Sequence, residues 1–193
     1  HLKKKKRLLV SPLLIALKKV VGDRDYIDYL RAFRYPLSGE FAMRTNILPD
    51  LRIPSDWGLE IGVLSEAWRN LAPKSVCQVE IADDYDHKHQ DLSEADADAG
   101  LNRMSTDICK AIFRKLAADG TVFTPNVFRT LKATYYRCAL DLLVAYYNDA
   151  KMNGLSIDPT RKNARSSFLP RISCGWDSSF WKTRTRHPFF FFF

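Results

Sequence analysis

The stretch PNVFRTLKATYYRCALDLLVAYYNDAKMN, residues 125–153, carries apolar residues at helical spacing over almost its whole length. Thr124 and Pro125 are typical of the first positions of a helix. Apolar residues recur on one face at successive turns, and this pattern predicts a long amphipathic helix that packs against a core. The expected inward stripe consists of Phe128, Leu131, Tyr135, Cys138 or Ala139, and Leu142.

Four more helices are predicted on the N-terminal side of this stretch. Gly22 and Gly120 are placed to end two of them, because glycine readily adopts the left-handed conformation of a helix C-terminus. Ser55 or Asp56 is the expected N-cap of another. The predicted helices span residues 8–21, 23–33 and 101–119, and the helix with the N-cap at Ser55 or Asp56 lies within residues 53–71.

Two short segments between these helices resemble strands. Residues 40–44 alternate large apolar and smaller or polar side chains after the turn formed by Pro36 and Gly39, and residues 76–81 are rich in β-branched residues. Together with the helices they predict an α/β fold with a small sheet covered by long helices.

The net charge of +8 is concentrated at the two ends of the chain. Residues 3–7 are all basic, and residues 161–193 hold seven basic residues against Asp177, so the intervening body carries a small net negative charge. A basic patch on the folded body is the usual signature of a nucleic-acid-binding protein. The charge pattern predicts no basic patch on the folded body, and the sequence has no recognised nucleic-acid-binding motif. Both observations argue against a nucleic-acid partner.

The cysteines and the apolar segments indicate a reduced, cytoplasmic protein without a membrane partner. The four cysteines are widely separated and form no Cys-x-x-Cys pair. The N-terminal stretch KKKKRLLVSPLLIAL imitates a signal peptide, but Lys18 and Lys19 follow it and its apolar run is too short to span a bilayer.

An acidic loop follows the second predicted strand. It contains Asp84 and Asp86 in an Asp-x-Asp pattern, followed by His87 and His89. Carboxylates and neutral imidazoles are ligands for Mg²⁺ or Mn²⁺, and ligands of α/β folds bind at strand ends. The alternative is a solvated polar loop in which the acids neighbour basic residues.

Glu60 lies between Gly58 and Gly62 at the start of an otherwise apolar helix. Its carboxylate could accept hydrogen bonds from sugar hydroxyls while Trp57 offers its face to a pyranose ring. The alternative is a glutamate placed near a helix N-terminus because the helix dipole stabilises it there.

Four segments of the chain stand out, in this order: YPLSGEFAMR, IPSDWGLEIGVLSE, QVEIADDYDHKHQDLS and VFRTLKATYYR. In order and spacing they resemble the C-terminal half of glucosyl-3-phosphoglycerate synthases, over residues 7–158. The resemblance implies a GT-A fold and a retaining transfer of glucose from a nucleotide-glucose to the 2-hydroxyl of 3-phosphoglycerate, with a divalent metal, Mg or Mn.

The same resemblance assigns roles to five residues. His87 matches the metal-binding histidine, Glu60 the sugar-contacting glutamate, and Trp57 an aromatic position of the same motif. Leu37 matches the leucine whose backbone carbonyl lies near the reacting centre, where oxygens steady an oxocarbenium-like state. His89 stands where some relatives have an acceptor-binding asparagine.

The resemblance also divides the chain. It implies a basic lead-in at 1–7 where the family has a Gly-Arg-Val-Thr loop, an acceptor-side part at 8–158, and an unrelated basic and aromatic tail at 159–193. The family's nucleotide-binding half lies upstream, so we expect this chain to be an incomplete glucosyltransferase without activity of its own, with a homodimer as a possible assembly. The alternative function is a non-enzymatic helical interaction module.

Overall fold

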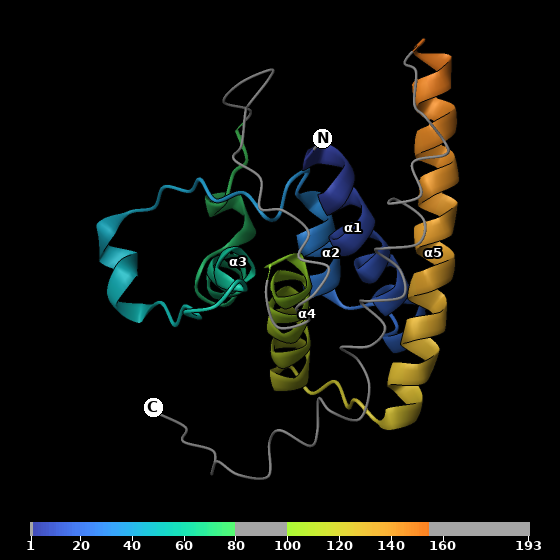
Figure 1. The fold of residues 1–193 in the computed structure, drawn as a ribbon. Coiled ribbons are helices and arrows are strands. Elements are labelled where there is room, and N and C mark those ends of the chain that lie inside the picture. The colour runs from blue at the N-terminus through green and yellow to red at the C-terminus, as the bar shows by residue number, and fades with distance from the viewer. Residues whose placement is uncertain (1, 80–99, 155–193) are drawn as a thin grey trace.

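The computed structural model describes residues 2–79 and 100–154, with side chains described from Leu9 to Val79 and from Arg103 to Gly154. Within these ranges the chain is helical (Figure 1). The α-helices are α1 (Leu2–Val21), α2 (Asp25–Ala32), α3 (Leu59–Asn70), α4 (Gly100–Ala118) and α5 (Pro125–Met152). Two short 3-10 helices are η1 (Thr45–Asp50) and η2 (Pro73–Ser75).

Helix α5 begins where its sequence predicts. The Thr124 hydroxyl accepts a hydrogen bond from the Val127 N–H at 3.3 Å, and Pro125 occupies the first turn, where its missing N–H costs nothing. The predicted inward stripe is confirmed as buried, except that Leu142 is only half-buried. The buried members are Phe128, Leu131, Tyr135, Cys138 and Ala139.

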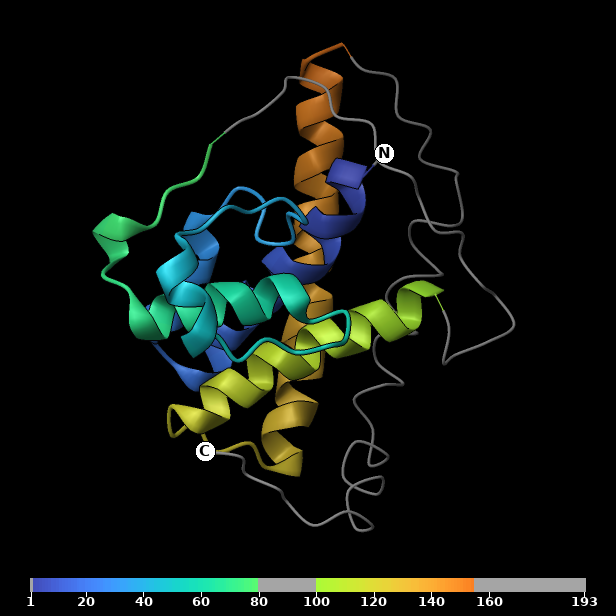
Figure 2. The same cartoon turned by 90° about the vertical axis from the view of Figure 1, so that its left-hand side faces the viewer.

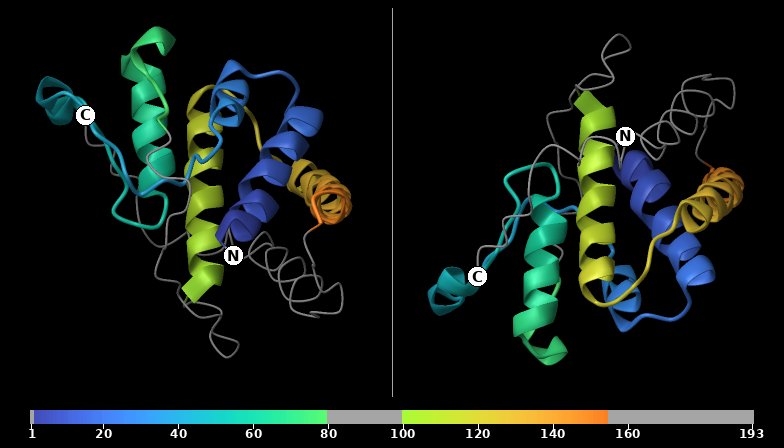
Figure 3. Two further views of the ribbon diagram at one scale, coloured as in Figure 1. Left: turned by 90° about the horizontal axis from the view of Figure 1, so that it is seen from above. Right: turned by 90° about the horizontal axis from the view of Figure 1, so that it is seen from below.

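The core lies between α1 and α5, which pack side by side, and it continues through α2 and α4 to α3 (Figures 1 and 2). Seen from above and below, α3 and α4 lie next to each other, with α1 between α4 and α5 (Figure 3). Fully buried leucine and isoleucine side chains link these helices, and their removal from water drives the packing. They include Leu13 and Leu17 of α1, Ile61 of α3, Ile108 and Ile112 of α4, and Leu131 of α5.

Helix α1 is longer than predicted, because it starts at Leu2 and not at residue 8. Lysine and arginine are good helix formers, so a basic sequence does not oppose the extension. The helix ends as predicted at Gly22, whose φ of 81° lies in the left-handed region. Gly120 ends α4 in the same conformation, and the Thr121 N–H bonds back to the Leu116 carbonyl at 2.9 Å.

The predicted strands are not found in the described residues. Residues 40–44 form an irregular segment in which Phe41 is 49% exposed, and residues 76–79 are also irregular. Residues 80–81 lie outside the described part. A strand depends on a neighbouring strand for its hydrogen bonds, and alternating side chains alone supply none. The small sheet and the α/β class are therefore not confirmed by the described residues, which are helical or irregular.

A buried polar contact joins α2 to α3. The Tyr26 hydroxyl lies 2.7 Å from Ser65 Oγ, and Ser65 Oγ donates to the Ile61 carbonyl at 2.6 Å, so Tyr26 is the donor of the first bond. Burial raises the pKa of Tyr26, which keeps its hydroxyl protonated and able to donate. The bond fixes α3 relative to α2 and thereby orients the first turn of α3.

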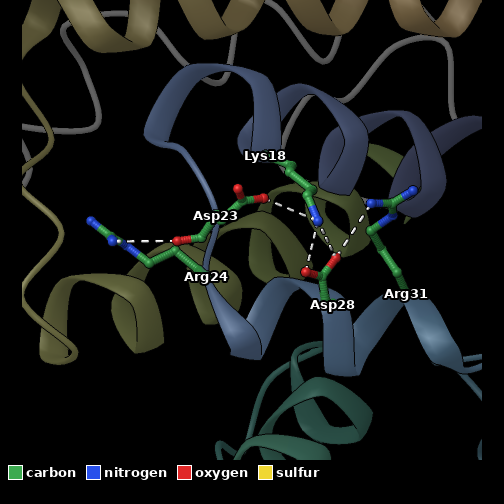
Figure 4. Close-up of polar contacts among 5 residues, drawn as sticks. All are labelled: Lys18, Asp23, Arg24, Asp28 and Arg31. Atoms are coloured by element: carbon green, nitrogen blue, oxygen red, sulfur yellow. Dashed lines mark hydrogen bonds and ion pairs between the residues drawn. The ribbon is translucent and has the colours of Figure 1, made fainter.

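A surface ion network connects the end of α1 to α2 (Figure 4). The Lys18 ammonium contacts both carboxylate oxygens of Asp28, at 2.8 and 2.7 Å, and one of Asp23 at 3.1 Å. Arg31 contacts Asp28 at 3.4 Å. The hydrogen bonds that Lys18 donates to Asp28 raise the pKa of Lys18 and lower the pKa of Asp28.

Asp28→Asn is expected to lower the melting temperature slightly at neutral pH. Because the folded pKa of Asp28 is lowered, its contribution is complete above its unfolded pKa and disappears as the pH falls through the folded value. Because the folded pKa of Lys18 is raised, its contribution persists below its unfolded pKa and disappears as the pH rises through the folded value. Thermal melts of wild type and variant should therefore differ most near neutral pH and converge in strong acid.

Asp23→Asn is the matched control for this prediction. Its carboxylate is 87% exposed and makes one contact with Lys18, whereas that of Asp28 is 48% exposed and makes two. An exposed single contact contributes little, so the control should change the melting temperature less. Equal effects of the two substitutions, or a difference that does not shrink in acid, would contradict the assignment.

Candidate functional site

Leu37 lies in a tight turn between α2 and η1. The Ser38 N–H bonds to the Tyr35 carbonyl at 3.1 Å, and Pro36 presets the backbone at the second position of this turn. The Leu37 side chain is 7% exposed and belongs to the core. Burial of the side chain holds the backbone of the turn in place, as a role for the Leu37 carbonyl would require.

The turn and the first residues of α3 lie next to each other. A Cβ atom built on Gly39 would lie 4.0 Å from Glu60 Oε1, which is ordinary contact distance. Glu60 is half-buried, and its carboxylate forms no hydrogen bond or ion pair with another described residue. The structure thus brings Gly39, which directly follows the turn of Leu37, close to the carboxylate of Glu60, although 21 positions separate Gly39 from Glu60 in sequence.

Trp57 lies three residues before Glu60, in the loop that enters α3, and is 41% exposed. Leu59 is 38% exposed and Phe41 is 49% exposed. Large apolar side chains on the surface are often parts of binding sites when they gather in one region. Trp57 therefore offers a partly exposed aromatic surface beside the start of α3.

Two glycines allow the backbone near Glu60 to approach its neighbours closely. A Cβ on Gly58 would lie 2.9 Å from Ala111 Cβ and 3.3 Å from the Asp107 carbonyl oxygen, both on α4. A Cβ on Gly62 would lie 2.7 Å from Cγ of Pro54 and closer still to its Cδ. Real Cβ atoms do not approach other atoms this closely, so both positions require glycine unless the backbone moves.

Polar contacts connect the loop before α3 to α4 and to α3 itself. Asp56 Oδ1 accepts the Gly58 N–H at 2.9 Å, and Asp56 Oδ2 lies 3.9 Å from Arg114 of α4. Further along α3, Glu66 Oε2 accepts the Arg52 N–H at 3.1 Å and pairs with Arg69 at 2.7 Å. The segment that carries Trp57 and Glu60 is thus tied to both α3 and α4.

The expected N-cap of α3 is corrected by this geometry. Neither Ser55 nor Asp56 occupies it, because the helix begins at Leu59 with Gly58 as N-cap and without a side-chain cap. The Asp56 carboxylate reaches the Gly58 N–H, which precedes the helix. Asp56 therefore stabilises the turn that leads into α3 and not the first turn of α3 itself.

The predicted metal and acceptor residues, His87 and His89, lie outside the described residues, as do Asp84 and Asp86. In the described ranges, no group of three or more His, Cys, Asp or Glu side chains could hold a metal ion. Of the five predicted site residues, the structure therefore describes Leu37, Trp57 and Glu60.

Comparison with known proteins identifies relatives over most of the chain. It is 42% identical over 152 residues to the glucosyl-3-phosphoglycerate synthase of Persephonella marina, which is 79% of this chain and 38% of that protein. The chain is similar to glucosyl-3-phosphoglycerate synthases. A second such synthase, from Methanococcoides burtonii, is 39% identical over 151 residues, which is 77% of this chain and 36% of that protein.

The similarity to glucosyl-3-phosphoglycerate synthases covers part of those proteins. This chain spans less than two-fifths of the length of either relative. No family model and no solved structure matches the chain. The similarity does not favour an unrelated helical interaction module, since both relatives are glucosyl-3-phosphoglycerate synthases.

Sequence reasoning missed the residues that hold the site in place. The sequence pattern indicates Asp56 only as a helix cap, and Gly58 and Gly62 only as neighbours of Glu60. Gly58 and Gly62 are four residues apart, which puts both on one face of a helix. This spacing indicates that another segment packs closely against that face. Pro54, which Gly62 contacts, gave no such signal, because its position depends on the path of the loop.

None of the described helices is long and apolar enough to pass through a membrane.

Proposed function

We propose that this chain forms the acceptor-side part of a retaining glucosyltransferase that transfers glucose from a nucleotide-glucose to the 2-hydroxyl of 3-phosphoglycerate. The observation that carries the proposal is the 42% identity to a glucosyl-3-phosphoglycerate synthase over 152 residues. The closeness of Glu60 to the turn of Leu37 supports it, because the family resemblance gives both positions roles at the reacting sugar.

In this proposal each described site residue has a distinct task. The Glu60 carboxylate accepts hydrogen bonds from glucose hydroxyls, which are stronger than neutral ones because the acceptor is charged. Trp57 packs its ring against the pyranose face. The Leu37 carbonyl lies near the anomeric centre and steadies the positive charge that develops there as the bond to the diphosphate breaks.

His87 and His89 complete the proposed site. His87 would hold a divalent ion, Mg or Mn, whose positive charge would neutralise the leaving diphosphate. His89 contacts the phosphate of the acceptor. A GT-A fold of the whole enzyme and a cytoplasmic location belong to the same proposal, and a homodimer is compatible with it.

These 193 residues on their own are expected not to transfer glucose. Catalysis needs metal, diphosphate and acceptor to be held together in one geometry, and the resemblance assigns the donor site to another part of the family's fold. Incubation of the purified chain with nucleotide-glucose, 3-phosphoglycerate and Mg²⁺ should yield no glucosylated product by mass spectrometry. Sustained turnover would contradict this expectation.

A chimaera tests the proposed function positively. The 152 matched residues of the Persephonella synthase are replaced by their counterparts from this chain, and product formation is measured against the parent enzyme. The folded chimaera should form glucosyl-3-phosphoglycerate, whereas a parent with the segment deleted should not. A chimaera that melts cooperatively and binds nucleotide-glucose as the parent does, yet forms no product, would contradict the proposal.

A further inference from the structure

The loop that precedes α3 brings Asp56 into contact with the backbone beside the proposed sugar-binding residues. Asp56 Oδ1 accepts the Gly58 N–H at 2.9 Å, and the Asp56 carbonyl accepts the Leu59 N–H at 3.2 Å. Asp56 thus accepts hydrogen bonds from the backbone amides on both sides of the Gly58 Cα. Trp57 lies inside this turn, and Glu60 follows it directly.

Asp56 is also linked to α4. Its second carboxylate oxygen lies 3.9 Å from Arg114, and the backbone of Gly58 lies so close to α4 that no side chain fits between them. The carboxylate is 29% exposed, so water only partly screens its interaction with Arg114. The entrance to α3 is therefore held against a second helix as well as folded on itself.

We propose that Asp56 is a positioning residue, which fixes the turn at Gly58 and thereby the ring of Trp57 and the carboxylate of Glu60. This inference rests on the proposed function, because it assigns Asp56 its importance through those two side chains. A site that must place hydrogen-bond acceptors on a sugar loses rate when they are displaced by about 1 Å. Asp56 does not need to touch the substrate to have this effect.

Substitutions of Asp56 can separate the effect of its hydrogen bond in the turn from the effect of its ion pair with Arg114. Asn can still accept the Gly58 N–H through its carbonyl oxygen, but it carries no charge to interact with Arg114. Ser can accept the same N–H more weakly. Ala can neither accept this N–H nor interact with Arg114. The hydrogen bond from the Gly58 N–H should therefore weaken in the order Asp, Asn, Ser, and it is absent in Ala.

The test measures kcat and KM for both substrates in the chimaera with Asp56→Asn, Asp56→Ser and Asp56→Ala. Asp56→Ala should lower kcat about tenfold to a hundredfold and leave the KM for 3-phosphoglycerate unchanged, because Asp56 is not assigned to the acceptor site. Asp56→Asn should keep most of the activity. Ser55→Ala, at an exposed neighbouring position, is the matched control.

Each outcome decides the proposal. Asp56→Ala with an unchanged kcat overturns it, and so does a loss in Asp56→Asn equal to that in Asp56→Ala, since the turn contact survives in Asn. If Asp56→Ala does not fold, Asp56→Ser decides. A kcat of Asp56→Ser below that of the unsubstituted chimaera but above the background rate supports the proposal, and a kcat equal to that of the unsubstituted chimaera overturns it. Glu60→Gln without effect would instead refute the proposed function, which keeps the two failures apart.

An independent readout uses the complete 193-residue chain. Amide hydrogen exchange at Gly58 and Leu59 should be faster in Asp56→Ala than in wild type and close to wild type in Asp56→Asn, because exchange requires these N–H bonds to open. Gly120, which ends α4, should exchange equally in all variants. Unchanged exchange at Gly58 in Asp56→Ala would overturn the proposed contact.

Discussion

Alanine at position 62 should destabilise the chain by about 3 kcal/mol, the upper range for overpacking a core position. The added Cβ would lie 2.7 Å from Cγ of Pro54 and closer to its Cδ. The proline ring is bonded to its own backbone, so it cannot rotate away as a flexible side chain can. Urea or thermal unfolding followed by circular dichroism measures the loss.

Gly39→Ala is the matched control for this substitution. Gly39 does not have a positive φ, and its added Cβ would meet only Glu60 Oε1 at 4.0 Å. Stability should therefore stay nearly constant or rise slightly, since alanine reduces the freedom of the unfolded chain. Similar losses in Gly39→Ala and Gly62→Ala would contradict the steric explanation.

A compensating substitution tests the identity of the clash. Pro54→Ala removes the two ring atoms nearest to position 62 and leaves the Pro54 nitrogen, at 3.6 Å, as an ordinary contact. The double variant Pro54→Ala, Gly62→Ala should recover most of the stability lost in Gly62→Ala. The coupling of the two effects follows from their contact, and additive losses would place the clash elsewhere.

Glu60→Gln in the chimaera should lower the rate of glucose transfer about tenfold to a hundredfold. Gln has the shape of Glu but no charge, and a hydrogen bond to a charged group contributes about 1.5–3 kcal/mol, which this rate change represents. Initial rates of product formation, with circular dichroism to confirm folding, measure the effect.

Asp141→Asn is the control for removal of a carboxylate. Asp141 pairs with Arg137 on the surface of α5, a helix that lies on the opposite side of the molecule from α3 (Figure 1). Its loss should leave the transfer rate unchanged. A Glu60→Gln chimaera as fast as the Asp141→Asn chimaera would remove Glu60 from the site.

The helices could be predicted because each depends on its own sequence. The apolar stripe of α5, its cap at Thr124 and the glycine ends of α1 and α4 are local signals, and the structure confirms them. The strand predicted at 40–44 is absent, because a strand does not depend on its own sequence alone. Its hydrogen bonds would have to come from a distant segment, and none of the described residues supplies them.

The candidate site shows the same limit. A joint sugar contact of Glu60 and Trp57 can be predicted because both lie at the start of one predicted helix. The approach of Gly39 to Glu60 and of Pro54 to Gly62 depends on how two loops fold back onto α3, which no local pattern encodes. The roles proposed for Leu37 and His89 rest on the family resemblance alone, whereas residue types already suggest a sugar contact for Glu60 and Trp57 and a metal ligand at His87.

The location of bound glucose tests the central claim most directly. A crystal structure of the chimaera with nucleotide-glucose, 3-phosphoglycerate and Mg²⁺ should show glucose hydroxyls within hydrogen-bond distance of the Glu60 carboxylate and the sugar ring against Trp57. Glucose bound away from α3, with the Glu60 carboxylate engaged only by protein groups, would contradict the account.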